Sequence, residues 1–253
     1  MLFSVILLSL IEGITEFLPI SSTGHLLLVS PYLPLDPAFY TVFDIAIQLG
    51  AILAVPTIFP HVFLEALRRP FQSSNYPIIA ATLPIVVVGF LTKDFIKSTL
   101  FNSTVIFWGL IVGGIGLIIM DRRPDPPSKT DRVTLRQSVI IGLWQCLALW
   151  PGMSRSAVTI MGGMAAGCTR QQATFFSFII AVPLLIGVVM ADLLGSSQTL
   201  SLVEWGWLGL GIGLTYGGCV ITIRWFLAWV NRRRLTAFGV YRIAIGLLGI
   251  LLI

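Results

Sequence analysis

Residues 12–25 read EGITEFLPISSTGH, and this stretch decides the architecture of the chain. A mainly apolar run precedes it from Leu2, breaks at the polar segment 19–24, and then resumes as far as residue 33. Each arm is shorter than the ~17–20 residues that a helix needs to cross a bilayer. Irregular backbone is tolerated at membrane depth only where it is buried in protein or lines an aqueous cavity. Residues 2–33 therefore predict a re-entrant helical hairpin; the alternative is one full span followed by an interfacial helix.

A second stretch has the same organisation. Residues 136–168 are apolar on both sides of the break PGMSRS at 151–156. A shift of 133 residues superimposes the two breaks, with Glu12 on Gln145, Ser21 on Ser154, Ser22 on Arg155, and Phe43 on Phe176. Each half then consists of a hairpin and three spans, and because three is odd, the second half must lie inverted, as in many transporters. We predict one membrane domain, 1–253, with pseudo-repeat halves 1–120 and 134–253 joined by a cytoplasmic linker, 121–133.

The composition places this architecture in a membrane. Of 253 residues, 56% are hydrophobic and only 11% are charged, and the mean hydropathy is +0.94. A soluble fold cannot bury so much apolar surface, which excludes a soluble enzyme, a disordered regulator and a secreted disulfide scaffold. The three cysteines show no disulfide or metal-binding spacing. We predict an all-α integral membrane protein with two re-entrant hairpins in an inverted-topology repeat and six transmembrane helices, at about 39–67, 74–92, 101–120, 171–194, 203–230 and 236–253.

Basic residues set the orientation of the spans. Loops on one side hold eleven Lys and Arg residues, and loops on the other hold only Lys93 and Lys97, so the first side faces the cytoplasm. This clustering at the ends of apolar runs explains the net charge of +5 and argues against nucleic acid as a partner. Arg224 and Arg242 lie eight residues from the basic cluster 232–234, and we predict that both snorkel to the cytoplasmic interface.

Five ionisable residues fall at predicted bilayer depth, where a charge costs about 2.5–3.5 kcal/mol, and they define the candidate site. They are Glu12, Glu16, His25, Asp44 and Arg155. Glu12 and Glu16 are four residues apart on one helix face, so the two carboxylates need a cation, an arginine or a shared proton. Arg155 needs an anion in turn. The competing interpretations are solvated glutamates at a helix end, a structural His25, and a structural salt bridge at Arg155.

Hydroxyl side chains flank these charges in both breaks: Ser21, Ser22 and Thr23 in the first, and Ser154, Ser156 and Thr159 in the second. A helix that begins at a break points its positive end at a bound anion. Arginine binds phosphate oxygens through two parallel hydrogen bonds. The combination is typical of phosphoryl transfer, in which arginine and amides hold the phosphate, a divalent cation on the carboxylates offsets charge, and a hydroxyl or water attacks.

The same residues belong to longer motifs. Residues 12–25, FDIAIQLG at 43–50, QCLALWPGMSRSAVT at 145–159 and FSFIIAVP at 176–183 together resemble the signature of the undecaprenyl-diphosphate phosphatase family, of the bacitracin-resistance type. The motifs are long and extend over both halves, so the resemblance covers nearly the whole chain. Asp44 departs from the family pattern, in which glutamate is expected.

The resemblance implies an activity and residue roles. The family hydrolyses undecaprenyl diphosphate to undecaprenyl phosphate and inorganic phosphate, which recycles the lipid carrier of peptidoglycan synthesis. Ser22 would be the nucleophile, with His25 as its base or as an alternative nucleophile. Glu12 and Glu16 would bind a divalent cation, Mg²⁺ or Ca²⁺, or act as acid and base. Arg155 would act in catalysis and hold the diphosphate, together with Ser21, Thr23, Ser154, Ser156 and Thr159.

The resemblance also implies a location and partners. We expect a multi-pass protein of the bacterial inner membrane whose site faces the outer side, with a polyprenyl diphosphate lipid as substrate and membrane lipids around it. A homodimer is left open. The main alternative is a transporter that moves a polyprenyl phosphate across the bilayer, which the inverted-repeat plan favours. An ion channel is disfavoured because the embedded charges are of mixed sign.

Overall fold

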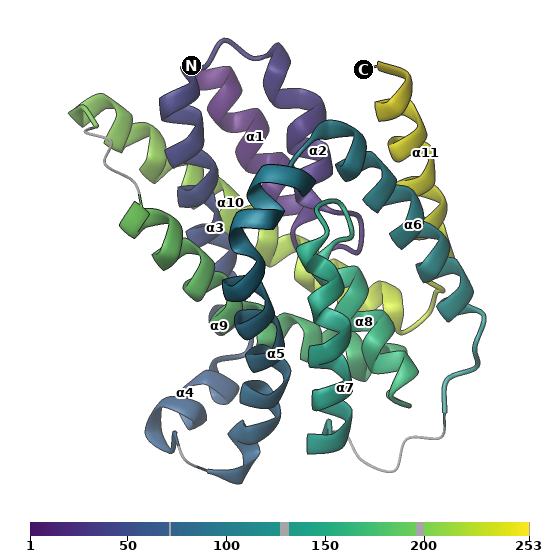
Figure 1. Cartoon of the computed structure of the whole chain (residues 1–253). Helices are drawn as coiled ribbons and strands as arrows, with labels where there is room; N and C mark the ends of the chain where they lie inside the picture. Colours follow the sequence, from purple (N-terminus) through teal and green to yellow (C-terminus); the bar gives the residue numbers. More distant parts are fainter. Residues whose placement is uncertain (71, 127–131, 196–199, 253) are drawn as a thin grey trace.

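The computed structural model describes residues 1–70, 72–126, 132–195 and 200–252, and every regular element in these ranges is helical (Figure 1). Residues 127–131 of the predicted linker and the last residue of the predicted sixth span lie outside them. Short 3₁₀ or π turns occupy Ser30–Tyr32, Ser73–Asn75, Ile96–Leu100 and Cys146–Leu149. The longer helices are α1 (Leu2–Thr15), α2 (Ser22–Val29), α3 (Pro37–Ile58), α4 (Pro60–Arg68), α5 (Tyr76–Phe95), α6 (Ser103–Asp121), α7 (Leu135–Gln145), α8 (Arg155–Ala165), α9 (Arg170–Gly195), α10 (Leu202–Val230) and α11 (Thr236–Leu252).

Five of the helical segments are long and apolar enough to cross a membrane, so the chain is a multi-pass membrane protein. They are Pro37–Ile58, Ser73–Phe95, Ser103–Asp121, Arg170–Asp192 and Leu202–Val230. The sixth predicted span corresponds to α11, which has 17 residues and belongs with the shorter apolar helices.

The predicted span 39–67 is wrong in its last part. α3 ends at Ile58, Phe59 leaves helical geometry, and a separate helix, α4, begins at Pro60. Proline has no N–H to donate and its ring collides with the preceding turn, so it begins a helix more readily than it continues one. The apolar run therefore contains a span and a short second helix.

The two broken stretches each fold as two short helices joined by a turn. α1 and α2 have 14 and 8 residues, and α7 and α8 have 11 each, so none of the four is long enough to cross a bilayer alone. The two hairpins enter from opposite ends of the molecule, and their turns meet near its middle (Figure 1). The polar segments of both halves are thereby brought together in the interior.

Helix starts recur along the chain at a constant spacing. α7, α8, α9 and α11 begin 133 residues after α1, α2, α3 and α6, respectively. The most extensive helix contacts join the two halves: α1 and α3 pack on α10, α5 on α7, and α6 on α11. Gly13 permits the close approach of α1 to α10, because a Cβ at this position would lie 3.0 Å from the backbone oxygen of Thr215. Each half is therefore completed by helices of the other.

Candidate active site

Two serines at the turns of the hairpins have an unusual backbone. Ser21 has a φ of 71° and Ser154 a φ of 66°, and no other non-glycine residue with positive φ occurs in the described ranges. Each directly precedes a helix, α2 or α8. Such conformations cost about 1–3 kcal/mol and persist where the surrounding structure enforces them, most often at functional sites. Both serines line one cavity, together with the first residues of the two helices.

An ion pair joins the two turns. Arg155 Nη2 donates to Glu16 Oε1 at 2.9 Å, and the Ser22 hydroxyl donates to the other oxygen of the same carboxylate at 2.8 Å. Arg155 Nη1 donates to the backbone oxygen of Ser177 at 3.1 Å, while its Nε has no partner among the described residues. The side chains of Arg155 and Glu16 are 11% and 12% exposed. The pair is therefore largely shielded from solvent but accessible from the cavity.

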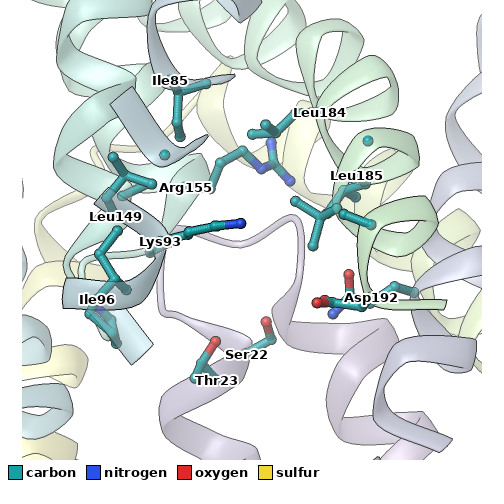
Figure 2. A pocket seen from close by; sticks show the side chains of 18 of the residues that line it. Ser22, Thr23, Ile85, Lys93, Ile96, Leu149, Arg155, Leu184, Leu185 and Asp192 are labelled. Carbon is teal, nitrogen blue, oxygen red and sulfur yellow. The ribbon is translucent and has the colours of Figure 1, made fainter. Parts of the chain in front are cut away.

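These groups line a cavity of about 730 Å³ (Figure 2). In Figure 2 the hydroxyls of Ser22 and Thr23 and the guanidinium of Arg155 point into this space. Apolar side chains of α5 and α9 form much of the remaining wall. The charged residues that line the cavity come from four parts of the chain: Glu16 after α1, Lys93 on α5, Arg155 on α8 and Asp192 on α9.

Further carboxylates surround Glu16. Glu12 is only 2% exposed, so the interpretation of solvated glutamates at a helix end is wrong. Its carboxyl group interacts electrostatically with Glu16, Asp44 and Arg155, and Asp44 interacts in turn with Asp192. Four acidic residues from three helices and a turn therefore share one region. Arg155 is the guanidinium that directly offsets part of this negative charge.

His25 lies beside this group, and both of its ring nitrogens are engaged. Nδ1 lies 2.8 Å from the backbone oxygen of Ser21, and Nε2 lies 2.8 Å from the hydroxyl of Tyr241, on which the ring also stacks. A carbonyl only accepts, so this geometry assigns the proton to Nδ1 and leaves Nε2 to accept from Tyr241. The ring does not line the cavity. These contacts favour a role in holding the turn before α2.

The hydroxyls of the second hairpin also have partners. Ser154 Oγ accepts a backbone N–H at 3.3 Å and caps α8. The Ser156 hydroxyl donates to the backbone oxygen of Phe17 at 2.8 Å, and the Thr159 hydroxyl lies 2.6 Å from that of Ser177. Ser156 and Thr159 are fully buried behind the cavity wall. Of these three residues, the structure brings only Ser154 to the cavity.

The prediction that Arg242 snorkels to the cytoplasmic interface is wrong. Its side chain is fully buried, whereas Arg224 is exposed. The guanidinium donates, at 2.8–3.3 Å, to the backbone oxygens of Pro19, Gly109, Leu110, Gly152 and Met153. The planar group has five N–H donors, and Nη2 shares its two among three of these acceptors. Pro19 belongs to the first turn and Gly152 and Met153 to the second, and one side chain therefore fixes both.

Comparison with known proteins identifies the family. The model of the family described as bacitracin resistance protein BacA matches residues 5–248. This chain belongs to the BacA family. An undecaprenyl-diphosphatase of Clostridium tetani is 37% identical over 97% of this chain and 94% of its own length. Proteins of the same name from Maridesulfovibrio salexigens and Phenylobacterium zucineum are 38% and 39% identical, each over 97% of this chain, and over 96% and 95% of their own. The predicted family is confirmed.

Metal ligands are few in this BacA family member. Within the residues that the structure describes, no three His, Cys, Asp or Glu side chains come together as a ready-made metal site. Both oxygens of Glu16 already accept hydrogen bonds, and Glu12 is buried one turn away. Mg²⁺ is commonly held by one or two carboxylates together with phosphate oxygens of a substrate. The two glutamates fit this shared kind of coordination better than a protein-only cage.

Three charged residues in or beside the candidate site were missed by sequence reasoning: Lys93, Asp192 and Arg242. Lys93 carried a usable signal, because it follows Val86, Gly89 and Phe90 at helical spacing and so places an ammonium on an apolar face. Asp192 is an acid near the end of an apolar run and carries no comparable signal. The sequence does not distinguish a buried Arg242 from a snorkelling one, because the carbonyls that it binds lie in distant segments.

Proposed function

We propose that this BacA family member is an undecaprenyl-diphosphate phosphatase, which hydrolyses undecaprenyl diphosphate to undecaprenyl phosphate and inorganic phosphate. The observation that carries the proposal is the contact between the two turns, where Arg155, Glu16 and Ser22 form one hydrogen-bonded group on the wall of a cavity. Relatives named undecaprenyl-diphosphatase, similar over nearly their full length, support the same activity. The reaction would recycle the lipid carrier of peptidoglycan synthesis and confer resistance to bacitracin.

Substrate binding begins with an exchange of partners at Arg155. The guanidinium turns from Glu16 towards the terminal phosphate, because a phosphate offers more charge and a matching pair of oxygens. The N-termini of α2 and α8 add backbone N–H groups and the positive ends of two helix dipoles. Thr23 and Ser154 line the same cavity and would border the phosphate site. This exchange releases Glu16 for proton transfer.

Ser22 is the nucleophile in this mechanism. Its Oγ attacks the terminal phosphorus, a bond from Oγ to phosphorus forms, and the bridging P–O bond breaks with its electron pair leaving on undecaprenyl phosphate. The hydroxyl proton passes to Glu16, whose Oε2 lies 2.8 Å from Oγ. Water then attacks the phosphoserine, its protons stay on the departing phosphate, and Glu16 returns the proton to Ser22.

Two alternative mechanisms replace Ser22 with another attacking group. A water activated by Glu16 in place of Ser22 needs the same carboxylate and the same cavity. His25 is less suited as the nucleophile, because both ring nitrogens already have partners and the ring lies outside the cavity lining. The Ser22 route is favoured because the hydroxyl and its base are already hydrogen-bonded.

A divalent cation, Mg²⁺ or Ca²⁺, is part of the proposal. Glu12 and Glu16 are the residues that would hold it, together with phosphate oxygens of the substrate. The ion would neutralise charge on the diphosphate and its leaving group. We expect EDTA to abolish turnover and added Mg²⁺ to restore it. In addition, Mg²⁺ should raise the melting temperature only when a diphosphate is present; equal activity with and without EDTA would reject the metal.

The proposed topology is six transmembrane helices, with α11 as the sixth, and two re-entrant hairpins in inverted halves. The constant spacing of helix starts supports the inverted plan, and the distribution of basic residues supports a site that opens to the outer side of the inner membrane. A homodimer stays part of the proposal. Labelling of single cysteines at Thr23 and Arg232 with an impermeant reagent in cells tests the orientation: the first should react from outside, and the second should not.

The activity itself is tested with detergent-purified protein. Phosphate release from farnesyl or undecaprenyl diphosphate should depend on enzyme and be lost in Arg155→Ala. Reconstituted vesicles distinguish the phosphatase from the transporter alternative. A transporter would move a lipid phosphate across the vesicle membrane without hydrolysis. An absence of phosphate release with metal present, or full activity in Arg155→Ala, would defeat the enzymatic proposal.

A further inference from the structure

We propose that Lys93 binds the phosphate that remains on the lipid, so that the site grips a lipid diphosphate at two points. This inference rests on the proposed function and deepens it. In the part of the chain that the structure describes, Lys93 and Arg155 are the cationic residues that line the cavity. They come from different helices, α5 and α8, and both side chains extend into the same space (Figure 2).

The charge of the headgroup requires a second cation. A single phosphate monoester already carries about −1.5 to −2 at neutral pH, and a diphosphate carries more. Arg155 is partly neutralised by Glu16, so it does not offset the whole charge of the headgroup. The phosphates are therefore attracted to the α5 and α8 walls, which carry Lys93 and Arg155. Lys93 is the cation available on the α5 wall.

The ammonium of Lys93 is suitably presented for this role. Its side chain is exposed, and the nitrogen lies 5.3 Å from the centre of the Phe90 ring. A ring face attracts a cation electrostatically without using its N–H donors. The Phe90 contact therefore orients Lys93 while leaving it suited to donate to a phosphate oxygen.

The apolar face of α5 decides which phosphate Lys93 binds. Val86, Gly89 and Phe90 lie on the same helix face as Lys93 and line the same cavity. Phe90 is 70% exposed, so this face is open to a lipid chain. A prenyl chain that lies along it places its first phosphate at Lys93, the cation on this face. The terminal phosphate then reaches Ser22 and Arg155 between the two turns.

Two product-like inhibitors separate the two phosphate positions. Farnesyl phosphate represents the phosphate that stays on the lipid, and inorganic phosphate represents the one that is released. In detergent-purified protein, Lys93→Met should raise the KM for farnesyl diphosphate and the inhibition constant of farnesyl phosphate about tenfold, with the inhibition constant of inorganic phosphate and kcat changed less than about threefold. Arg155→Lys should instead raise the inhibition constant of inorganic phosphate. Lys93→Arg, which keeps the charge, should restore most of the affinity.

Arg232→Met is the matched control, because it also removes one exposed positive charge but lies in the turn after α10, outside the cavity. Three results would overturn the inference. They are wild-type KM and inhibition constants in Lys93→Met, an equal rise in the inhibition constants of both inhibitors, or the same rise in Arg232→Met. Failure of the proposed function is distinguishable, since the wild type would then release no phosphate. In that case direct binding of farnesyl phosphate to the wild type and Lys93→Met still decides the role of Lys93.

Discussion

The turn before α2 and the turn before α8 have the same backbone shape but different chemistry. Both place a serine at positive φ directly before a helix, Ser21 in one and Ser154 in the other. The first turn carries the Glu16 carboxylate and leads into the Ser22 hydroxyl, and the second leads into Arg155. At one more equivalent position Glu12 is matched by Gln145, whose amide donates to the backbone oxygen of Ala81 at 2.9 Å. In the proposed mechanism, one turn supplies reactive groups and the other supplies a phosphate-binding cation.

A single residue holds both turns, and it has no counterpart. Position 109, which lies 133 residues before Arg242, is a glycine. A Cβ at Gly109 would collide with the backbone oxygen of Pro151 in the second turn, and a Cβ at Gly113 would collide with the guanidinium itself. Only one large side chain fits between the turns. Similar halves thus meet around a residue that belongs to one of them.

Removal of the Ser22 hydroxyl should have the largest effect. If the first turn supplies the nucleophile, Ser22→Ala lowers kcat by about 10³-fold or more while farnesyl diphosphate still binds. Steady-state phosphate release and direct binding measure the two quantities. Thr41→Ala, which removes a hydroxyl from α3 bonded only within its own helix, is the control. Turnover within about tenfold of the wild type in Ser22→Ala would point to direct attack by water.

Glu16→Gln should be the next most damaging. The amide keeps the size of the side chain but loses the proton acceptor for Ser22 and the charge that pairs with Arg155, so kcat should fall about 10²–10³-fold. Inorganic phosphate should bind as well or better, since Arg155 no longer has a competing anion. A rise in KM with unchanged kcat would show that Glu16 only orders the free site.

The elements of the fold were largely predictable, because their signals are local. The polar break in an apolar run, seen around Pro19 and again around Pro151, locates both hairpins, and the 133-residue shift pairs them. Phe59 is where local reasoning failed: hydropathy continues across it, although Pro60 begins a new helix. The roles of Ser156, Thr159 and Arg242 were not predictable, because their partners lie on other helices. Residue type placed Ser156 and Thr159 near the site but Arg242 at the cytoplasmic interface, and only the packing shows that all three support the turns.

Arg242→Lys tests whether a single guanidinium aligns both turns. Lysine keeps the charge but has one compact ammonium, which cannot reach five carbonyl oxygens. Small displacements of catalytic groups are costly, so kcat should fall about 10–100-fold with a smaller change in KM, and gel filtration should show folded protein. Arg224→Lys, an exposed change on α10, is the control.

A second substitution displaces the guanidinium without altering it. Gly113→Ala should lower kcat and the melting temperature, whereas Gly217→Ala, where an added Cβ meets nothing within 4 Å, should not. If Arg242→Lys keeps the wild-type kcat, the residue has no positioning role.

The smallest expected effect is a difference in stability between glycine substitutions at the positive-φ serines of the two turns. Glycine adopts positive φ without strain, so Ser21→Gly should stabilise the protein by about 1 kcal/mol. Ser154→Gly should gain a few tenths of a kcal/mol less, because the Ser154 hydroxyl caps α8 and the Ser21 hydroxyl caps nothing. Thermal unfolding in detergent measures both. Destabilisation by Ser21→Gly would mean that the hydroxyl itself holds the turn.

The packing of α1 on α10 and of α6 on α11 has a consequence for how the protein is made. Ribosomes deliver helices in order, so the segment that carries Ser22 enters the bilayer long before the helix that carries Tyr241 and Arg242. Until α11 is inserted, Arg242 is not yet there to bind the backbone oxygen of Pro19, and Tyr241 is not yet there to contact His25. In a nascent chain the first turn therefore lacks these two supports until α11 has been inserted.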